Sequence, residues 1–336
     1  MIFDSESVFE DNVITVLKQH GWKDGVLRYP TEQDLLDNWK GILYRNNNDI
    51  DRLGKYPLTD GEMAQIIEQI ETLRTPLALN SFVNGRTVSI TRDNKEDVAH
   101  FGKEISLYIY DRKEIAGGKS TYQIAQQPVY PAKNKMLNSR RGDLVLLING
   151  MPLIHIELKK SGIPVSQATN QIEKYTHEGV FTGLFRLVQI FVAMNPDDAV
   201  YFANPGVDKF NPSYYFHWAD YNNEPICGGQ NPGKDEWKLF IGGTSGTAGL
   251  LSIPMAHQLI GFYTIADSAD GCLKVLRSYQ YIAANAISDV VRKCDWEQRP
   301  TTPGRPGGYV WHTTGSGKTM TSFKSAQLIA DSHDAD

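Results

Sequence analysis

A predicted β-hairpin around Asn149-Gly150 constrains the fold of this chain more than any other feature. Two β-prone runs flank this pair, and Asn-Gly between such runs is the strongest short sequence signal for a hairpin. Because side chains alternate along a strand, His155, Glu157 and Lys159 share one face of the second run, whereas isoleucine and leucine occupy the other. The sequence therefore predicts a hairpin with one charged face and one apolar face.

The length of the turn decides where Asp143, at the start of the first run, points. A strict two-residue turn would pair Asp143 with Ile156 and direct its side chain away from Glu157. We expect a three-residue loop with a left-handed Gly150, forming a bulge, or an Asp143 outside the regular ladder. A regular two-residue turn with Asp143 pointing away from Glu157 would exclude a shared metal site.

The charged face has residues suited to phosphodiester hydrolysis. Asp143 and Glu157 would bind Mg²⁺ through hard oxygen ligands, with the Leu158 carbonyl as a further ligand. Lys159 would position or help deprotonate the attacking water and stabilise the charge on the phosphorane. The same residues could instead form a solvated strand face with ordinary cross-strand ion pairs.

The pattern Asp143…Glu157-Leu158-Lys159 resembles the Asp…Glu-x-Lys signature of restriction-endonuclease-like nucleases. With its flanking residues and the later Gln171-x-x-x-Tyr175 motif, the chain resembles the restriction (R) subunit of type I restriction–modification enzymes. The resemblance implies that Gln171 and Tyr175 support DNA binding and cleavage. Gly142 departs from the family, which usually has proline there, and we expect altered loop stiffness rather than lost metal binding.

Glu10 has two interpretations. Superfamily members often carry an additional glutamate on the first helix, which would make Glu10 a further catalytic acid. Ser7 and Glu10 also have the spacing of a capping box, in which Glu10 would bond the helix N-cap backbone.

A second motif, Gly315-Ser316-Gly317-Lys318-Thr319, has the composition of a phosphate-binding loop. In such a loop Lys318 reaches the terminal phosphates of ATP and the Thr319 hydroxyl binds magnesium. We expect a strand at 308–312 before it and a helix at 319–330 after it, with Phe323 toward a sheet. Seventeen residues follow Thr319, too few for the acidic strand of an ATPase, so we expect weak nucleotide binding and no hydrolysis by this chain alone.

Gln280 resembles the adenine-reading glutamine of superfamily 2 helicases; without the loop it would be a helix-surface residue. Together the two elements resemble the opening segment of a RecA-like motor domain. This resemblance implies ATP as a cofactor of the full-length subunit.

The formal net charge of −5 argues against a protein that coats nucleic acid by bulk electrostatics, but it does not exclude DNA delivered by partners. A local basic cluster does precede the hairpin, and we expect it to lie beside the site: Lys133, Lys135, Arg140 and Arg141. The acidic start and the lack of a run approaching ~18 apolar residues predict a cytoplasmic protein without a membrane span.

Hydrophobic periodicity predicts an α/β fold. We expect helices at 5–20, 60–74, 165–177 and 272–292, strands at 87–90, 106–110, 143–158 and 187–193, an irregular stretch at 111–138 and a surface loop at 220–249. The resemblance implies a restriction-endonuclease-like mixed sheet flanked by helices over residues 1–260. Residues 261–336 would form the truncated N-terminal part of a RecA-like ATPase/translocase domain.

The resemblance implies Mg²⁺-dependent endonucleolytic cleavage of double-stranded DNA by an ATP-dependent type I site-specific deoxyribonuclease. In that family, a specificity subunit recognises DNA and a methyltransferase subunit protects it. Two alternatives remain open: a non-catalytic docking module, and a stand-alone nucleotide-dependent repair or methyl-directed nuclease.

Overall fold

The computed structural model describes residues 2–115, 117–131, 140–207, 209–269, 271–293 and 308–332. It divides into two compact units. The first comprises Met1–Trp218 and Ile226–Val275, and the second comprises Ala219–Pro225 and Leu276–Asp336. The domain boundary expected near residue 260 stays a prediction, whereas the compact units divide after Val275.

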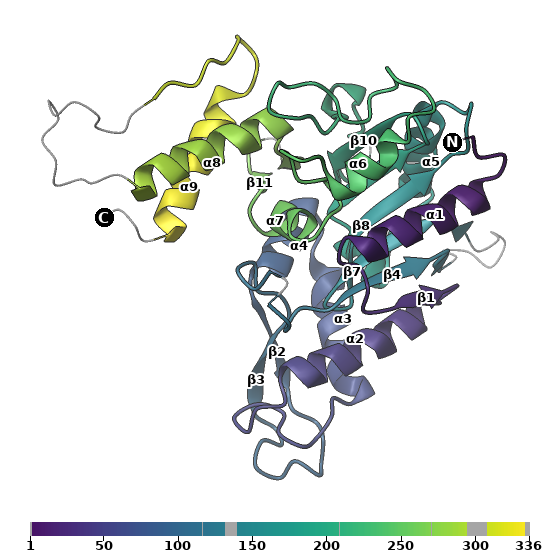
Figure 1. Ribbon diagram of the computed structural model, residues 1–336. Helices are drawn as coiled ribbons and strands as arrows, with labels where there is room; N and C mark the ends of the chain where they lie inside the picture. Colours follow the sequence, from purple (N-terminus) through teal and green to yellow (C-terminus); the bar gives the residue numbers. More distant parts are fainter. Residues whose placement is uncertain are drawn as a thin grey trace, which may run out of the picture. The chain divides into compact units, whose positions relative to one another are not determined.

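A six-stranded mixed sheet forms the centre of the first unit (Figure 1). Its strands, in spatial order, are β1 (Val26–Arg28), β4 (Tyr122–Gln126), β7 (Leu144–Ile148), β8 (Met151–Leu158), β9 (Ile190–Met194) and β10 (Ala199–Ala203). The β1–β4 and β8–β9 pairs are parallel, and the others are antiparallel. Every residue of the five strands from β4 to β10 is buried, as expected for a sheet covered on both faces. The predicted mixed sheet is confirmed.

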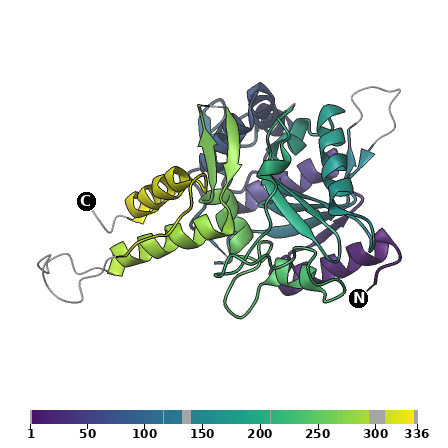
Figure 2. The ribbon, with the colours of Figure 1, turned by 90° about the horizontal axis from the view of Figure 1, so that it is seen from above.

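Helices cover both faces of this sheet. Those of the first unit are α1 (Glu6–Gln19), α2 (Glu32–Asn46), α3 (Asp60–Thr72), α4 (Pro76–Asn84), α5 (Val165–His177), α6 (Glu236–Gly242) and α7 (Met255–Gly261), with 3-10 turns at Gly183–Leu187 and Pro212–Tyr214. Figures 1 and 2 show α1 and α5 on opposite faces. The helices predicted at 5–20, 60–74 and 165–177 are confirmed, and no described helix has the length and hydropathy needed to cross a membrane.

Three two-stranded ladders accompany the main sheet: β2 (Thr87–Thr91) with β3 (Glu104–Tyr108), β5 (Val129–Tyr130) with β6 (Arg140–Arg141), and β11 (Thr264–Asp267) with β12 (Cys272–Val275). The irregular stretch expected at 111–138 is wrong, because β4 and β5 lie within it. Strand β4 can be buried despite its polar sequence because its glutamines form hydrogen bonds. Gln123 pairs with Asn38, and Gln126 donates to Glu10.

Two other expectations need correction. The predicted loop at 220–249 contains α6, which buries Trp237, Phe240 and Ile241. The helix expected from 272 to 292 begins instead at Ser278, because Cys272–Val275 pairs with β11 before α8 (Ser278–Lys293) starts.

The described part of the second unit consists mainly of two packed helices, α8 and α9 (Lys318–Ser332). The strand expected at 308–312 is absent, and Tyr309 and Trp311 are 89% and 86% exposed. The orientation expected for α9 is also wrong, because Phe323 is 54% exposed while Thr321 is buried. No strand among the described residues of this unit covers the apolar side of α9.

Candidate active site

The β7–β8 hairpin has a two-residue turn. Asn149 and Gly150 have φ angles of 52° and 84°, as a type I′ turn requires, and Ile148 pairs directly with Met151. The expected three-residue loop is therefore wrong. A Cβ on Gly150 would lie 2.8 Å from the Trp39 Cα, so the turn has no room for a side chain.

A bulge within the strands supplies the one-residue shift that we expected from the turn. Leu146 pairs with Ile154, but the next pair is Leu147 with Pro152, so Leu153 lies opposite no residue of β7. The shift continues to Leu144, which pairs with Ile156. One step further out, the alternation of side chains places Asp143 on the same face as Glu157.

Asp143 lies just outside the regular ladder, as we expected. Strand β7 begins at Leu144, and the Asp143 carboxylate accepts a hydrogen bond of 2.6 Å from the Leu158 N–H. Its main-chain carbonyl accepts a second, of 2.7 Å, from the Gln127 N–H. Asp143 is thereby held between β4 and the end of β8.

Glu157 is fully buried, and neither carboxylate oxygen accepts a hydrogen bond of normal length, although Asp143 and Lys159 are close enough to oppose the rise of its pKa. His155 Nε2 lies 3.4 Å from Oε2 of Glu157, and Lys159 Nζ lies 3.6 Å from Oε1. Burial raises the pKa of Glu157 to about 8, although Lys159 opposes the shift. Loss of hydration and the neighbouring Glu157 also raise the pKa of Asp143 well above its usual value.

Lys159 connects this pair of acids to α1. Its ammonium donates a 2.9 Å hydrogen bond to the Leu158 carbonyl and lies 3.5 Å from the Glu6 carboxylate. The side chain is almost completely buried, so the solvated strand face considered as an alternative does not describe these residues.

Two carboxylates and one main-chain carbonyl are the candidate metal ligands. Within the described ranges, no group of three or more His, Cys, Asp or Glu residues is arranged to hold a metal ion. Oxygen ligands of these types nevertheless fit Mg²⁺, which usually keeps several waters and takes few protein ligands. A buried carboxylate without hydrogen bonds is costly, so a cation is the partner that Glu157 fits.

Glu10 does not cap α1, because the N-cap is Ser5, whose side chain accepts a hydrogen bond from the Val8 N–H. Glu10 instead accepts hydrogen bonds of 2.6 Å from Gln126 and 3.2 Å from Gln127. Because Gln126 pairs with Leu144, its side chain lies on the face of the sheet opposite Glu157. Burial raises the pKa of Glu10, and the Glu10 charge contributes to the raised pKa of Asp143, so its role as a further acid stays a prediction.

Gln171 and Tyr175 on α5 form a partly buried connection to the strand that leads to Asp143. Gln171 donates to the Tyr175 hydroxyl at 2.6 Å, and this hydroxyl donates to the Arg141 carbonyl at 2.9 Å. Burial raises the pKa of Tyr175 to about 12. The pair therefore fixes the main chain two residues before Asp143 and is not a simple surface pair.

The basic residues beside the site differ in their partners. Arg140 forms a two-pronged ion pair with Glu178, at 2.9 and 3.0 Å, while the exposed Arg141 lies over the ring of Tyr29. Lys133 and Lys135 lie outside the described residues. The sequence missed other polar residues near the site, because they lie in the stretch predicted to be irregular: Gln126, Gln127 and Tyr130.

In the second unit, Gln280 contacts the phosphate-binding loop. Its amide donates to the carbonyls of Ser316 and Gly317 at 3.1 and 3.4 Å. Gly315 and Gly317 have φ angles of 78° and 80°, and a Cβ on Gly317 would lie 2.4 Å from the Gln280 amide nitrogen. The Lys318 ammonium folds back onto the Thr313 carbonyl at 3.0 Å, and Thr319 lies in the first turn of α9.

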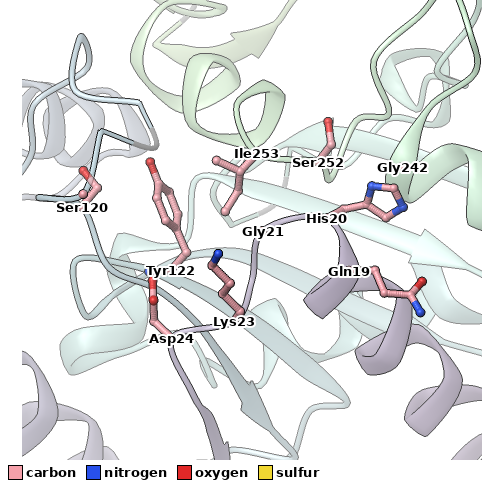
Figure 3. Close-up of a pocket in the computed structure, with 11 residues that line it drawn as sticks. Gln19, His20, Gly21, Lys23, Asp24, Ser120, Tyr122, Gly242, Ser252 and Ile253 are labelled. Carbon is pink, nitrogen blue, oxygen red and sulfur yellow. Dashed lines mark hydrogen bonds between the residues drawn. The ribbon is translucent and has the colours of Figure 1, made fainter.

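A polar cavity of about 590 Å³ lies at the other end of α1 (Figure 3). Gln19 and His20 come from the end of the helix, Lys23 and Asp24 from the turn that follows, and Tyr122 from β4. None of the predicted site residues lines this cavity. The candidate site is thus set by buried polar groups at the end of β8 and not by this cavity.

The chain is similar to known proteins over most of its length. Residues 4–210 match the family model for the type I restriction enzyme R protein N terminus, and residues 279–336 match the SWI2/SNF2 ATPase model. The SsaAORF53P endonuclease subunit of Staphylococcus saprophyticus is 30% identical over 342 residues, and the SauCOLORF180P subunit of Staphylococcus aureus is 31% identical over 336 residues. Each match covers 99% of this chain and 31% of the relative.

The EcoprrI endonuclease subunit of Escherichia coli is 26% identical over 343 residues, covering 93% of this chain and 99% of the relative. The relatives named above are all described as type I restriction enzyme endonuclease subunits, and this chain spans about a third of the length of the two from Staphylococcus. The chain belongs to the family of type I restriction enzyme R proteins, of which it contains the N-terminal region.

Proposed function

We propose that this chain is the nuclease portion of the restriction subunit of a type I restriction–modification enzyme and cleaves double-stranded DNA with Mg²⁺. The observation that carries the proposal is the buried Glu157 carboxylate, which accepts no hydrogen bond of normal length and lies beside Lys159. Relatives named as endonuclease subunits support it. On this proposal the mixed sheet is of the restriction-endonuclease-like class.

Asp143, Glu157 and the Leu158 carbonyl would hold the metal ion. When bound, Mg²⁺ would polarise the scissile phosphate and lower the pKa of an attacking water. The Lys159 ammonium lies against two of these ligands, so a positive charge already occupies this position. Lys159 would hold the water in position at Nζ and stabilise the negative charge that develops on the phosphate.

Arg141 would contact the DNA backbone, because its side chain is exposed while Gln171 and Tyr175 fix its main chain. Arg140 would exchange Glu178 for a phosphate oxygen, a geometry to which its guanidinium is well matched. Since the chain has a net charge of −5, specificity and methyltransferase subunits would bring the DNA to this surface.

The second unit would begin the RecA-like motor of the full-length subunit. Gln280 lies beside the loop and would recognise adenine by exchanging its present hydrogen bonds with Arg277, Ser316 and Gly317. Lys318 and Thr319 would contribute to ATP and magnesium binding. The SWI2/SNF2 match over residues 279–336 supports the same assignment.

Substitution in the full-length subunit, assembled with its partner subunits, tests this function. Asp143→Ala and Lys159→Ala should each lower the DNA cleavage rate by about 10³-fold or more while leaving ATP hydrolysis unchanged. Lys103→Ala is the matched control, because Lys103 is an exposed lysine next to the separate β2–β3 hairpin. Unchanged cleavage by both site variants would reject the nuclease and favour a docking module.

A further inference from the structure

A buried tyrosine–histidine pair lies behind the candidate metal ligands. The Tyr130 hydroxyl, from β5, is 2.8 Å from His155 Nδ1, and His155 Nε2 is 3.4 Å from the Glu157 carboxylate. Tyr130 is 1% exposed, and His155 and Glu157 are both 0% exposed. The three polar groups therefore form a row from β5 to the end of β8 in which water has no access.

The hydrogen bond with Tyr130 determines which ring nitrogen of His155 carries the proton. A neutral imidazole carries one proton, on either Nδ1 or Nε2. When the Tyr130 hydroxyl donates to Nδ1, the histidine proton lies on Nε2 and faces Glu157. In the other tautomer, a lone pair of Nε2 would face the Glu157 carboxyl group.

Aromatic packing holds the pair rigidly. The Tyr130 ring lies 4.6 Å from the Phe185 ring, and the His155 ring lies 5.4 Å from Phe181 and 6.0 Å from Phe191. Packed rings of this kind have no free rotamers, so the imidazole offers Nε2 in one fixed direction.

The same pair contacts the main chain that leads to Asp143. A Cβ on Gly142 would lie 2.5 Å from the Tyr130 hydroxyl and 2.8 Å from His155 Cε1. Gly142 thus lets the chain pass directly over the pair before it reaches Asp143. The pair therefore adjoins both acidic residues: His155 Nε2 approaches the Glu157 carboxylate without a hydrogen bond, and Gly142 brings the main chain of Asp143 past the same two side chains.

We propose that Tyr130 and His155 are positioning residues, which orient the Glu157 carboxylate and the Asp143 main chain for metal binding. The proposal rests on the metal-dependent nuclease function given above. Residues behind a metal ligand that fix its orientation commonly change metal affinity by about 10- to 100-fold when they are removed.

Metal affinity is the first test, measured by calorimetric titration of the 336-residue chain with Mn²⁺ as the probe. His155→Leu should weaken binding by about 10- to 100-fold, and Tyr130→Phe by about 10-fold. His155→Gln should stay within about threefold of the wild type, because the glutamine amide can place an N–H near the position of Nε2. Asp143→Asn should abolish binding at this site and provides the baseline.

A second tyrosine–histidine pair in the same unit offers matched controls. The Tyr122 hydroxyl is also 2.8 Å from Nδ1 of a buried histidine, His257, but this pair adjoins neither Asp143 nor Glu157. His257→Leu and Tyr122→Phe should therefore lower the melting temperature without changing Mn²⁺ affinity. Tyr130→Phe removes only a hydroxyl, so it keeps the test open where His155→Leu fails to fold.

The outcomes separate the two proposals. Wild-type Mn²⁺ affinity in Tyr130→Phe and in folded His155→Leu, with Asp143→Asn inactive in binding, overturns the positioning role and leaves the nuclease in place. An equal loss of Mn²⁺ affinity in His155→Leu and His155→Gln also overturns it, because an N–H group facing Glu157 would then not affect metal binding. Absence of Mn²⁺ binding by the wild-type chain rejects the metal site itself.

The histidine tautomer is a spectroscopic test. In the Mg²⁺-loaded chain with ¹⁵N-labelled histidine, the His155 ring should show the chemical shifts of a neutral imidazole protonated at Nε2. A ring protonated only at Nδ1 contradicts the proposal.

Discussion

The end of strand β8 and the phosphate-binding loop contain two sets of residues with recognisable chemistry, and they are supported very differently. Glu157 and Lys159 are buried at the end of a sheet that helices cover on both faces. Around Gly315–Thr319, the flanking Trp311 and Phe323 are exposed, and no strand is described beside the loop. A short motif identifies a chemistry, but the number of elements packed around it decides how firmly its atoms are held.

The largest expected effect compares two phenylalanines. Phe191 is fully buried against α5, so Phe191→Ala should lower the free energy of unfolding of the first unit by about 3–5 kcal/mol. Phe323→Ala should change stability by less than about 0.5 kcal/mol, because more than half of this side chain is exposed. Urea unfolding followed by circular dichroism measures both. Similar losses would show that the two regions are equally well packed.

A turn substitution should have a smaller but clear effect. Gly150→Ala places a methyl group against Trp39 at a positive φ, so it should destabilise the first unit by about 2–3 kcal/mol. Gly246→Ala is the control, since a Cβ there meets nothing within 4 Å. If both variants unfold at the same urea concentration, the hairpin is not held as tightly as the structure indicates.

The stability of the first unit should depend on pH, because it contains a buried histidine. Burial depresses the pKa of His257 from 6.5 to about 4, so the unfolded chain binds a proton more readily than the folded one. The contribution of neutral His257 to the free energy of unfolding is complete above pH 6.5 and is lost as the pH falls toward 4. Between pH 7 and 5 the loss should be about 2 kcal/mol.

The variant His257→Gln should remove this part of the pH dependence, as measured by urea unfolding at each pH. His20→Gln, a change at a partly exposed histidine, serves as the control. A wild-type slope in His257→Gln would mean that another group is responsible.

The smallest effect is expected at the loop. Lys318→Ala should change the ATP affinity of this chain by less than about tenfold, since we expect weak binding and the ammonium already contacts the Thr313 carbonyl. In the full-length subunit the same change should abolish ATP hydrolysis. Measurable ATP turnover by the 336 residues alone would contradict the difference drawn between the two regions.

Sequence spacing predicted which candidate site residues lie close together better than it predicted the surrounding structure. Asp143, Glu157 and Lys159 follow from strand alternation and a family signature, and α5 lies at the predicted residues 165–177. The position of the bulge could not be predicted, because an extra residue anywhere along either strand shifts the register equally.

Burial of polar residues and exposure of apolar ones explain the other misses. Gln126 and Tyr130 lie in a segment with the composition of a loop, but hydrogen bonds to Glu10 and His155 allow their burial. For α9, the spacing of apolar residues defined an apolar side of the helix, but it did not show whether another element covers that side. Periodicity is a local property, whereas covering depends on elements distant in sequence.

Because Leu153 is unpaired, Asp143 and Glu157 share a face of the sheet only when the number of residues between them has the right parity, odd or even. One residue inserted or deleted between the two acids exchanges the faces of the sheet, unless a bulge is gained or lost with it. Two residues together preserve the face. Among relatives that keep both acids, loop lengths should therefore vary in steps of two, and an odd step should mark a hairpin whose bulge has disappeared or moved.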